Sequence, residues 1–154
     1  MSKLDDISIR QTSAQAIRPL RHSVLRAGLP LEAAVFDGDE EATSRHLAAL
    51  DQSGKLVGCA SIVWRSFNDE PAWQLRGMAI DDGLRGRGIG RLLLSRIELL
   101  VLDEGHSSTL WCNARTPAVG FYLAMGWKEF GEEFQVETAG PHYRMVKKLG
   151  ERSP

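Results

Sequence analysis

Several features that mark particular protein classes are scarce in this sequence. Cysteine is rare: Cys59 and Cys112 are the only two, and they form neither a CxxC pair nor a zinc-ligand spacing. Each lies in an apolar, strand-like run, so we expect two buried, reduced thiols rather than a disulfide or metal ligands. No metal site is predicted.

Long apolar runs are also missing. The longest, such as Leu56–Trp64, have the length of a strand and fall well short of the roughly 20 residues of a membrane-spanning helix. The first residues, Met1–Asp6, contain no apolar signal segment. We therefore expect no association with a membrane and a cytoplasmic location.

An excess of charge of either sign is absent as well. Nineteen Lys and Arg residues face twenty Asp and Glu, which gives a net charge of −1. Nucleic-acid-binding domains usually have an excess of basic residues, so we expect no nucleic-acid partner. The 154 residues, 43% of them hydrophobic, suit one folded domain. We predict a single domain over residues 1–150, with a disordered tail at 151–154.

Hydrophobic periodicity predicts the element order β-α-β-β-β-α-β-α-β-β, a mixed α/β sheet with flanking helices. Strands are expected at residues 6–10, 46–50, 56–64, 73–80, 108–113, 128–137 and 142–149. Helices are expected after Thr12 or Ser13, from Ile89 to near Gly105, and from Pro117 to Met125. Pro19 interrupts the first pattern, so that helix should begin there or kink. Residues 31–44 lack a clear period and predict a long surface connection that can include a short helical turn.

The loop from Arg85 to Gly90 carries the strongest chemical signal. It lies between a predicted strand and a predicted helix, where unpaired backbone amides and the positive end of a helix favour phosphate. Its three glycines permit left-handed backbone angles and a close approach of the ligand. The spacing fits neither the dinucleotide fingerprint nor a Walker A loop. Taken alone, the loop is equally compatible with a plain strand-to-helix turn.

The loop sequence RGRGIG resembles the R/Q-x-x-G-x-G/A loop of the GNAT acetyltransferase superfamily. Asn113, the run Pro117–Tyr122 and the segment Ala124–Trp127 are similar to the strand, helix and helix end that follow in that superfamily. The resemblance extends over roughly residues 55–149. It implies a GNAT-type acyl-CoA N-acyltransferase fold, with a splayed pair of parallel strands in the mixed sheet, and acetyl-CoA as co-substrate.

The same resemblance implies a set of residues that bind acetyl-CoA. The backbone of Met78, Ala79 and Ile80 would pair with the pantetheine arm, and the amide of Met78 or Ala79 would polarise the thioester carbonyl. Asn113 matches a position that contacts this arm. The pyrophosphate would be held by the loop residues Arg85, Gly86, Arg87, Gly88, Ile89, Gly90 and Arg91.

Tyr122 matches the superfamily's general acid, which protonates the departing CoA thiolate. A tyrosine with a pKa near 10 carries the required proton at pH 7. The alternative interpretation is a core aromatic with a satisfied hydroxyl. The general base is less defined: His142 is one candidate, and Glu70, Glu132, Glu133 or a chain of waters are the others.

The acceptor is open at this stage. A carboxylate or phosphate on a small acceptor would suit arginine side chains, and the alternative for helical arginines is a solvated face. The candidate arginines are Arg18, Arg21, Arg26, Arg76 and Arg115. Four tryptophans are expected mainly in the core, with one or two available to line an acceptor pocket.

The leading hypothesis is an acetyltransferase that moves the acetyl group of acetyl-CoA to an amine of a small molecule or peptide. Direct attack in a ternary complex is expected, and an acyl-enzyme on Cys112 is the alternative route. The alternative functions are a non-catalytic CoA-binding sensor or scaffold and a nucleotide-binding regulator. The last two strands can pair across a two-fold axis, as in many proteins of this fold, which predicts a homodimer.

Overall fold

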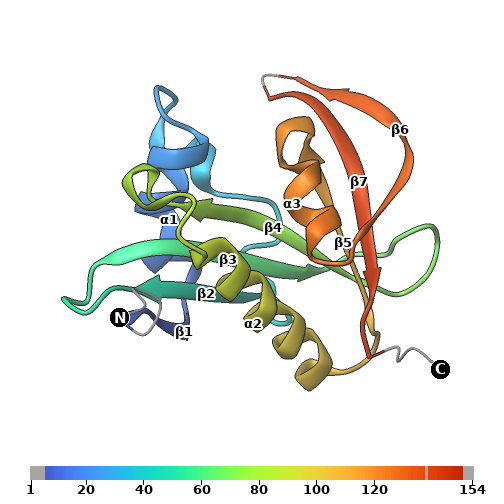
Figure 1. The fold of residues 1–154 in the computed structure, drawn as a ribbon, viewed down its shortest axis with the longest axis horizontal. Helices are drawn as coiled ribbons and strands as arrows, with labels where there is room; N and C mark the ends of the chain where they lie inside the picture. The colour runs from blue at the N-terminus through green and yellow to red at the C-terminus, as the bar shows by residue number, and fades with distance from the viewer. Residues whose placement is uncertain (1–5, 138, 151–154) are drawn as a thin grey trace. The chain divides into compact units, whose positions relative to one another are not determined.

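Seven strands, hydrogen-bonded in the order β1-β2-β3-β4-β5-β7-β6, dominate residues 6–137 and 139–150, the part of the chain that the computed structural model describes (Figure 1). The strands are β1 (Ser8–Thr12), β2 (Arg45–Leu50), β3 (Leu56–Trp64), β4 (Trp73–Ile80), β5 (Thr109–Arg115), β6 (Lys128–Val136) and β7 (Gly140–Lys148). The α-helices are α1 (Ala14–Leu25), α2 (Ile89–Glu104) and α3 (Val119–Ala124); short 3-10 helices are η2 (Leu31–Ala34), η3 (Asp82–Leu84) and η4 (Thr116–Ala118). The predicted element order and mixed sheet are confirmed.

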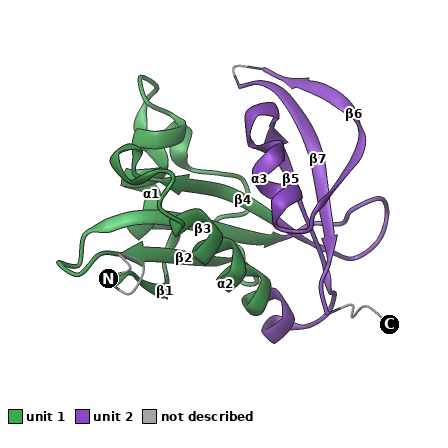
Figure 2. Ribbon diagram, viewed as in Figure 1, with its two compact units in different colours: residues 1–63, 75–100 green, residues 64–74, 101–154 purple. Residues whose placement is uncertain are grey.

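The chain divides into two compact units, coloured separately in Figure 2. Unit 1 comprises residues 1–63 and 75–100, and unit 2 comprises residues 64–74 and 101–154. Strand β4 contributes Trp73 and Gln74 to unit 2 and its later residues to unit 1.

In unit 1 the sheet is covered by a helix on each face. β1 and β2 are antiparallel, as are β2 and β3. Ile17 and Leu20 of α1 form a buried cluster whose sheet members are Ala48, Cys59 and Ala79. On the opposite face, Leu93 of α2 lies so close to Gly58 that an added Cβ would come within 2.9 Å of it. A side chain in place of Gly58 would force the end of the Leu93 side chain to move.

Helix α1 begins at Ala14, five residues before Pro19. The expectation that the helix starts at this proline is therefore wrong. Ser13 caps the helix, since its hydroxyl accepts a hydrogen bond from the Ala16 amide at 3.1 Å. Pro19 then lies inside the helix, where it removes one backbone donor. Burial of Ile17 and Leu20 (0% and 8% exposed) offsets that loss.

The connection between α1 and β2 contains the short helical turn expected within residues 31–44, but some of its side chains are buried rather than at the surface. Leu31–Ala34 forms the 3-10 helix η2, and Ala34, Asp39 and Ser44 are buried. A buried aspartate in a loop needs a cationic or hydrogen-bonding partner, and Asp39 has one, described below.

In unit 2, β7 pairs antiparallel with β5 on one side and β6 on the other. β4 and β5 form a parallel ladder of two pairs, Trp73↔Leu110 and Gln74↔Trp111. The expected helix from Pro117 to Met125 is split: Pro117 lies in η4, and the α-helical part starts at Val119. No helix in the described residues is long and apolar enough to cross a membrane.

Candidate active site

The loop between η3 and α2 has the conformation that its glycines permit. Gly86 and Gly88 have φ angles of +77° and +88°, in the left-handed region that other residues avoid. No atom lies within 4 Å of the position where a Cβ on Gly86 would stand. The glycine is therefore required here by the backbone angle rather than by crowding, and space is left above the loop.

The amides of this loop form no backbone hydrogen bond within the part of the chain that the structure describes. The first backbone hydrogen bond of α2 runs from the Leu92 amide to the Gly88 carbonyl at 3.1 Å. Among the described residues, the amides from Gly86 to Arg91 have no backbone acceptor. The first turn of this 16-residue helix contains no acidic side chain. Unpaired amides at the positive end of a long helix make a site for an anion such as a phosphate.

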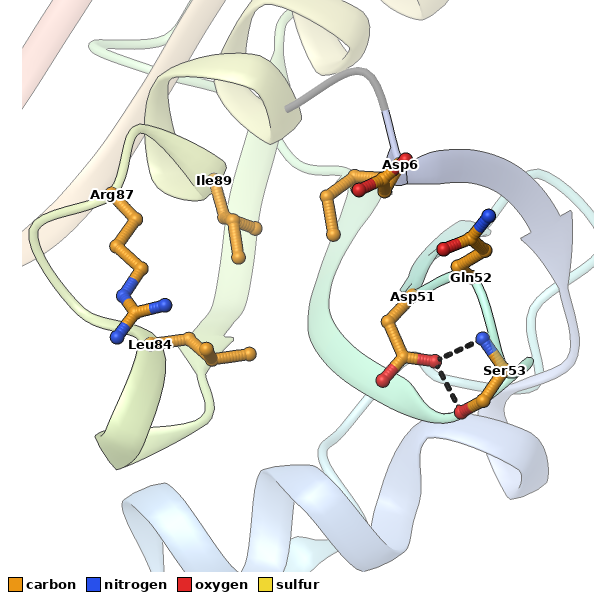
Figure 3. A pocket seen from close by; sticks show the side chains of 8 residues that line it. Asp6, Asp51, Gln52, Ser53, Leu84, Arg87 and Ile89 are labelled. Atoms are coloured by element: carbon orange, nitrogen blue, oxygen red, sulfur yellow. Dashed lines mark hydrogen bonds between the residues drawn. The ribbon is translucent and has the colours of Figure 1, made fainter. Parts of the chain in front are cut away.

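The three arginines of the loop are exposed. Arg85 pairs with Asp82 at 3.0 Å, while Arg87 lines a pocket of about 540 Å³. Figure 3 shows Leu84, Arg87 and Ile89 on one side of this pocket and the turn Asp51–Ser53, with Asp6, on the other. The carboxylates of Asp6 and Asp51 in its wall disfavour an anion inside this pocket, although Arg87 and Ile89 of the glycine loop also line it.

After Gly77, successive backbone amides of β4 point alternately toward β3 and away from it. The Ala79 amide hydrogen-bonds the Cys59 thiol of β3, and the Asp81 amide donates to the Val57 carbonyl of the same strand at 2.9 Å. Successive amides along a strand point in opposite directions. The amides of Met78 and Ile80 therefore point away from β3.

Gly77 begins this segment with a φ of +63°, which breaks the regular strand. The ladder between β4 and β5 covers only Trp73 and Gln74, although β4 continues to Ile80. The two residue pairs of this parallel ladder lie within unit 2.

Tyr122 of α3 is 7% exposed and packs against Trp127, with ring centroids 5.0 Å apart. Its hydroxyl hydrogen-bonds the Cys112 thiol. Burial, and then the neighbouring Cys112, raises the pKa of Tyr122 well above 10. The hydroxyl is therefore protonated throughout the physiological range, as a general acid must be.

Cys112 is a poor nucleophile in this structure. Burial raises the pKa of its thiol to about 12, although the Tyr122 hydrogen bond acts in the opposite direction. Thiolate is the reactive form, and it is nearly absent at pH 7. The thiol of Cys59 is likewise raised to about 12 by burial. Both cysteines are free and buried, as the sequence predicts.

His142 of β7 is 6% exposed, and its Nδ1 lies 2.9 Å from the Gly140 carbonyl oxygen. A carbonyl only accepts, so Nδ1 carries the proton and the neutral ring has its lone pair on Nε2. Among the described residues, no partner is found for Nε2. Of the other base candidates, Glu70 pairs with Lys148, Glu133 accepts from the Thr116 hydroxyl, and Glu132 is exposed.

Four of the five arginines considered for the acceptor have partners within unit 1. Arg21 is fully buried, contrary to a solvated helix face, and donates to Asp39 at 2.7 Å. Arg18 pairs with Asp39 and Glu40. Arg26 lies over the Phe36 ring, and Arg76 donates to the Asp37 carbonyl. Only Arg115 among the five is exposed with no partner in the described residues.

Asp39 is the important residue that the sequence analysis missed. Burial acts to raise its pKa, but hydrogen bonds from Arg21 and the Phe36 amide outweigh this and hold the pKa below its usual value. One signal was available: Arg21 stands on the same helical face as Ile17 and Leu20. A charged residue on a buried face requires a partner, although the sequence does not say which one.

Comparison with known proteins decides the family. The family model of the acetyltransferase (GNAT) domain matches residues 28–149. The chain belongs to the GNAT acetyltransferase family. An uncharacterized N-acetyltransferase of Bacillus subtilis (strain 168), YitI, is 32% identical over 146 residues, which is 93% of this chain and 97% of YitI. The prediction of an acetyltransferase is confirmed.

Solved structures agree with the GNAT fold. Escherichia coli ElaA has a TM-score of 0.77 at 19% identity and covers 92% of this chain and 99% of its own. An aminoglycoside 6'-N-acetyltransferase, solved with coenzyme A, has a TM-score of 0.74 at 17% identity, over 96% of this chain and 99% of its own. At these identities the likeness establishes the fold alone. The predicted fold class is confirmed.

Proposed function

We propose that this GNAT protein transfers the acetyl group of acetyl-CoA to an amine of a small molecule or peptide by direct attack. The observation that carries the proposal is the set of unpaired amides from Gly86 to Arg91 at the start of α2. These donors suit the pyrophosphate of CoA, and Arg87 and Arg91 add positive charge beside them.

The backbone of β4 supports a position for the reacting thioester. Met78 and Ile80 direct their amides away from β3, and they are the donors that an extended pantetheine arm requires. Of the two amides that the sequence analysis offers for the carbonyl oxygen, Met78 is the better candidate because the Ala79 amide is directed at Cys59. An amide aimed at this oxygen stabilises the negative charge that develops on it.

In the reaction, the amine nitrogen forms a bond to the thioester carbonyl carbon, and the carbon–sulfur bond breaks. The proton lost by the amine goes to a base, for which we propose Nε2 of His142. The leaving thiolate takes a proton from the Tyr122 hydroxyl, which carries that proton at pH 7. The raised pKa of Cys112 disfavours the acyl-enzyme route.

A pair of glycine variants tests the role of the loop. Gly86 and Gly28 have similar φ angles, +77° and +84°, and neither has an atom within 4 Å of an added Cβ. Changing either one to Ala therefore costs similar stability. We expect Gly86→Ala to raise the Kd for acetyl-CoA by roughly 10-fold or more, the effect of losing one hydrogen bond to a charged group.

Gly28→Ala is the matched control, and its Kd should equal that of the wild type. Binding is measured by isothermal titration calorimetry, and thermal melts confirm that both variants lose similar stability. Equal affinity for acetyl-CoA in Gly86→Ala, Gly28→Ala and the wild type would remove the loop from the site. Binding of CoA without thiol release on a broad amine panel would favour the sensor or scaffold alternative.

A further inference from the structure

In unit 2, the sheet face opposite α3 gathers polar and basic side chains. Tyr122 of α3 hydrogen-bonds Cys112, so the α3 face of β5 is that of Cys112 and Ala114, both buried. Side chains alternate along a strand, which puts Asn113 and Arg115 on the other face, and both are exposed. This second face is a surface of unit 2 that α3 does not cover.

Strand register brings a second arginine onto this face. Asn113 pairs with Arg144 of β7, and Arg115 pairs with His142. Directly opposite residues share a face, and Arg115 and Arg144 are diagonal neighbours, with Cα atoms about 7–8 Å apart in such positions. Both arginines are exposed. Their long side chains can converge on one group between them.

Neither arginine has a counter-charge in the described part of the chain. Among residues 6–137 and 139–150, no carboxylate lies within salt-bridge distance of Arg115 or Arg144. The carboxylate of Glu133 on β6 is bound instead by the Thr116 hydroxyl at 2.8 Å. Two like charges that lie close together repel each other. A bound anion would relieve that repulsion and accept hydrogen bonds from both guanidinium groups.

The same face holds the candidate base. His142 lies directly opposite Arg115 in register, and its free ring nitrogen is Nε2. The Phe134 ring packs on His142 with centroids 5.9 Å apart. Phe130, opposite Arg144 and 38% exposed, borders the patch. A proton acceptor, two cations and an aromatic edge therefore occupy adjacent positions on one sheet.

We propose that the acceptor is a small amine that also carries an anionic group, a carboxylate or a phosphate. Arg115 and Arg144 bind the anion, and the amine faces Nε2 of His142, which takes its proton. This inference rests on the proposed acetyl transfer and names the class of its acceptor. The arginines are specificity-determining residues that do not touch the reacting atoms.

Matched acceptor pairs test the inference. The enzyme is assayed by thiol release from acetyl-CoA with amino acids against their carboxamides, and with phosphoethanolamine against ethanolamine. We expect the anionic member of at least one pair to have a kcat/KM at least 10-fold higher. The pair that responds tells carboxylate from phosphate recognition.

The variants Arg115→Gln and Arg144→Gln separate binding from chemistry. Each should raise KM for the anionic acceptor by roughly 10-fold or more, the effect expected for a charge-assisted hydrogen bond, and leave kcat and the rate with neutral amines unchanged. Arg96→Gln, which removes an exposed arginine from α2, is the control. It should change neither the KM for the anionic acceptor nor kcat. Unchanged melting temperatures check that the variants fold.

Three results would overturn the inference. The first is a higher kcat/KM for the neutral member of every acceptor pair. The second is that the arginine variants lose kcat/KM equally with the anionic and the neutral acceptor. In either case thiol release still occurs, and the proposed acetyl transfer stands. No thiol release with any amine, together with no binding of acetyl-CoA, overturns the proposed function and the inference together.

Discussion

At the scale of single residues, environment decides which groups can react. Tyr122 and Cys112 share a hydrogen bond in a buried site, and burial raises the pKa of both. Tyr122 therefore carries a proton at pH 7, as its proposed role requires, while the reactive thiolate form of Cys112 is nearly absent.

Replacing Tyr122 tests its role as general acid. Tyr122→Phe removes the hydroxyl but keeps the ring that packs on Trp127, so the protein should fold. We expect kcat to fall by roughly 10²–10⁴-fold with little change in the Kd for acetyl-CoA. Cys112→Ala, assayed in parallel by thiol release, should keep kcat near that of the wild type. A Tyr122→Phe enzyme with full kcat would leave the tyrosine as a core aromatic only.

At the scale of elements, the buried ion pair between Arg21 and Asp39 holds the segment that connects α1 to β2 in place. Arg21 donates to Asp39, to the Ala34 carbonyl and to the Ser61 hydroxyl of β3. Its side chain also lies over the Phe36 ring, 4.1 Å from the centroid. Residues 31–44 are therefore held to α1 and the sheet although they contain little regular structure.

Breaking this pair should cost stability. Asp39→Asn leaves the Arg21 guanidinium buried without its counter-charge, which typically costs about 3–5 kcal/mol, or roughly 6–20 °C in Tm for a chain of this length. Glu40→Gln removes only an exposed partner of Arg18 and should cost less than about 1 kcal/mol. Thermal melts of both variants at pH 7 provide the comparison. Equal Tm values for Asp39→Asn and the wild type would contradict a stabilising role of the Arg21–Asp39 pair.

The contribution of Asp39 to stability should also depend on pH. The pKa of Asp39 is lower in the folded protein than its usual value. Its ionisation therefore stabilises the fold above the ordinary aspartate pKa of about 3.9, and this contribution is lost as the pH falls through the lower folded value. In urea titrations, the stability difference between wild type and Asp39→Asn should shrink below about pH 4.

At the scale of the whole molecule, the sequence predicted the succession of elements well and the tertiary contacts poorly. The bounds of β3 and β4 match their predicted ranges because apolar runs and flanking turn residues delimit them. The start of α1 could be placed either at the Ser13 cap or at Pro19. Local sequence preferences do not decide between these two positions. The Arg21–Asp39 pair and the Arg115–Arg144 neighbours depend on loop packing and strand register, which one sequence does not reveal.

The glycine loop was predictable for a different reason. Its proposed function depends on backbone amides and left-handed angles, and the spacing of the glycines indicates where those angles are possible. The roles of Met78, Asn113, Tyr122 and His142 came from a resemblance to the GNAT superfamily or from their neighbourhood in the chain. They remain predictions that the variants above address.

The central claim is that the loop at the start of α2 binds acetyl-CoA. A thermal-shift titration of the wild-type protein with acetyl-CoA, CoA, ATP and NAD tests it most directly. At 100 times its Kd a ligand adds about 2.7 kcal/mol of stability, which is roughly 5–11 °C for a chain of this length. We predict this shift with acetyl-CoA and CoA and none with ATP or NAD at the same concentrations. A melt that neither CoA form moves would contradict the account.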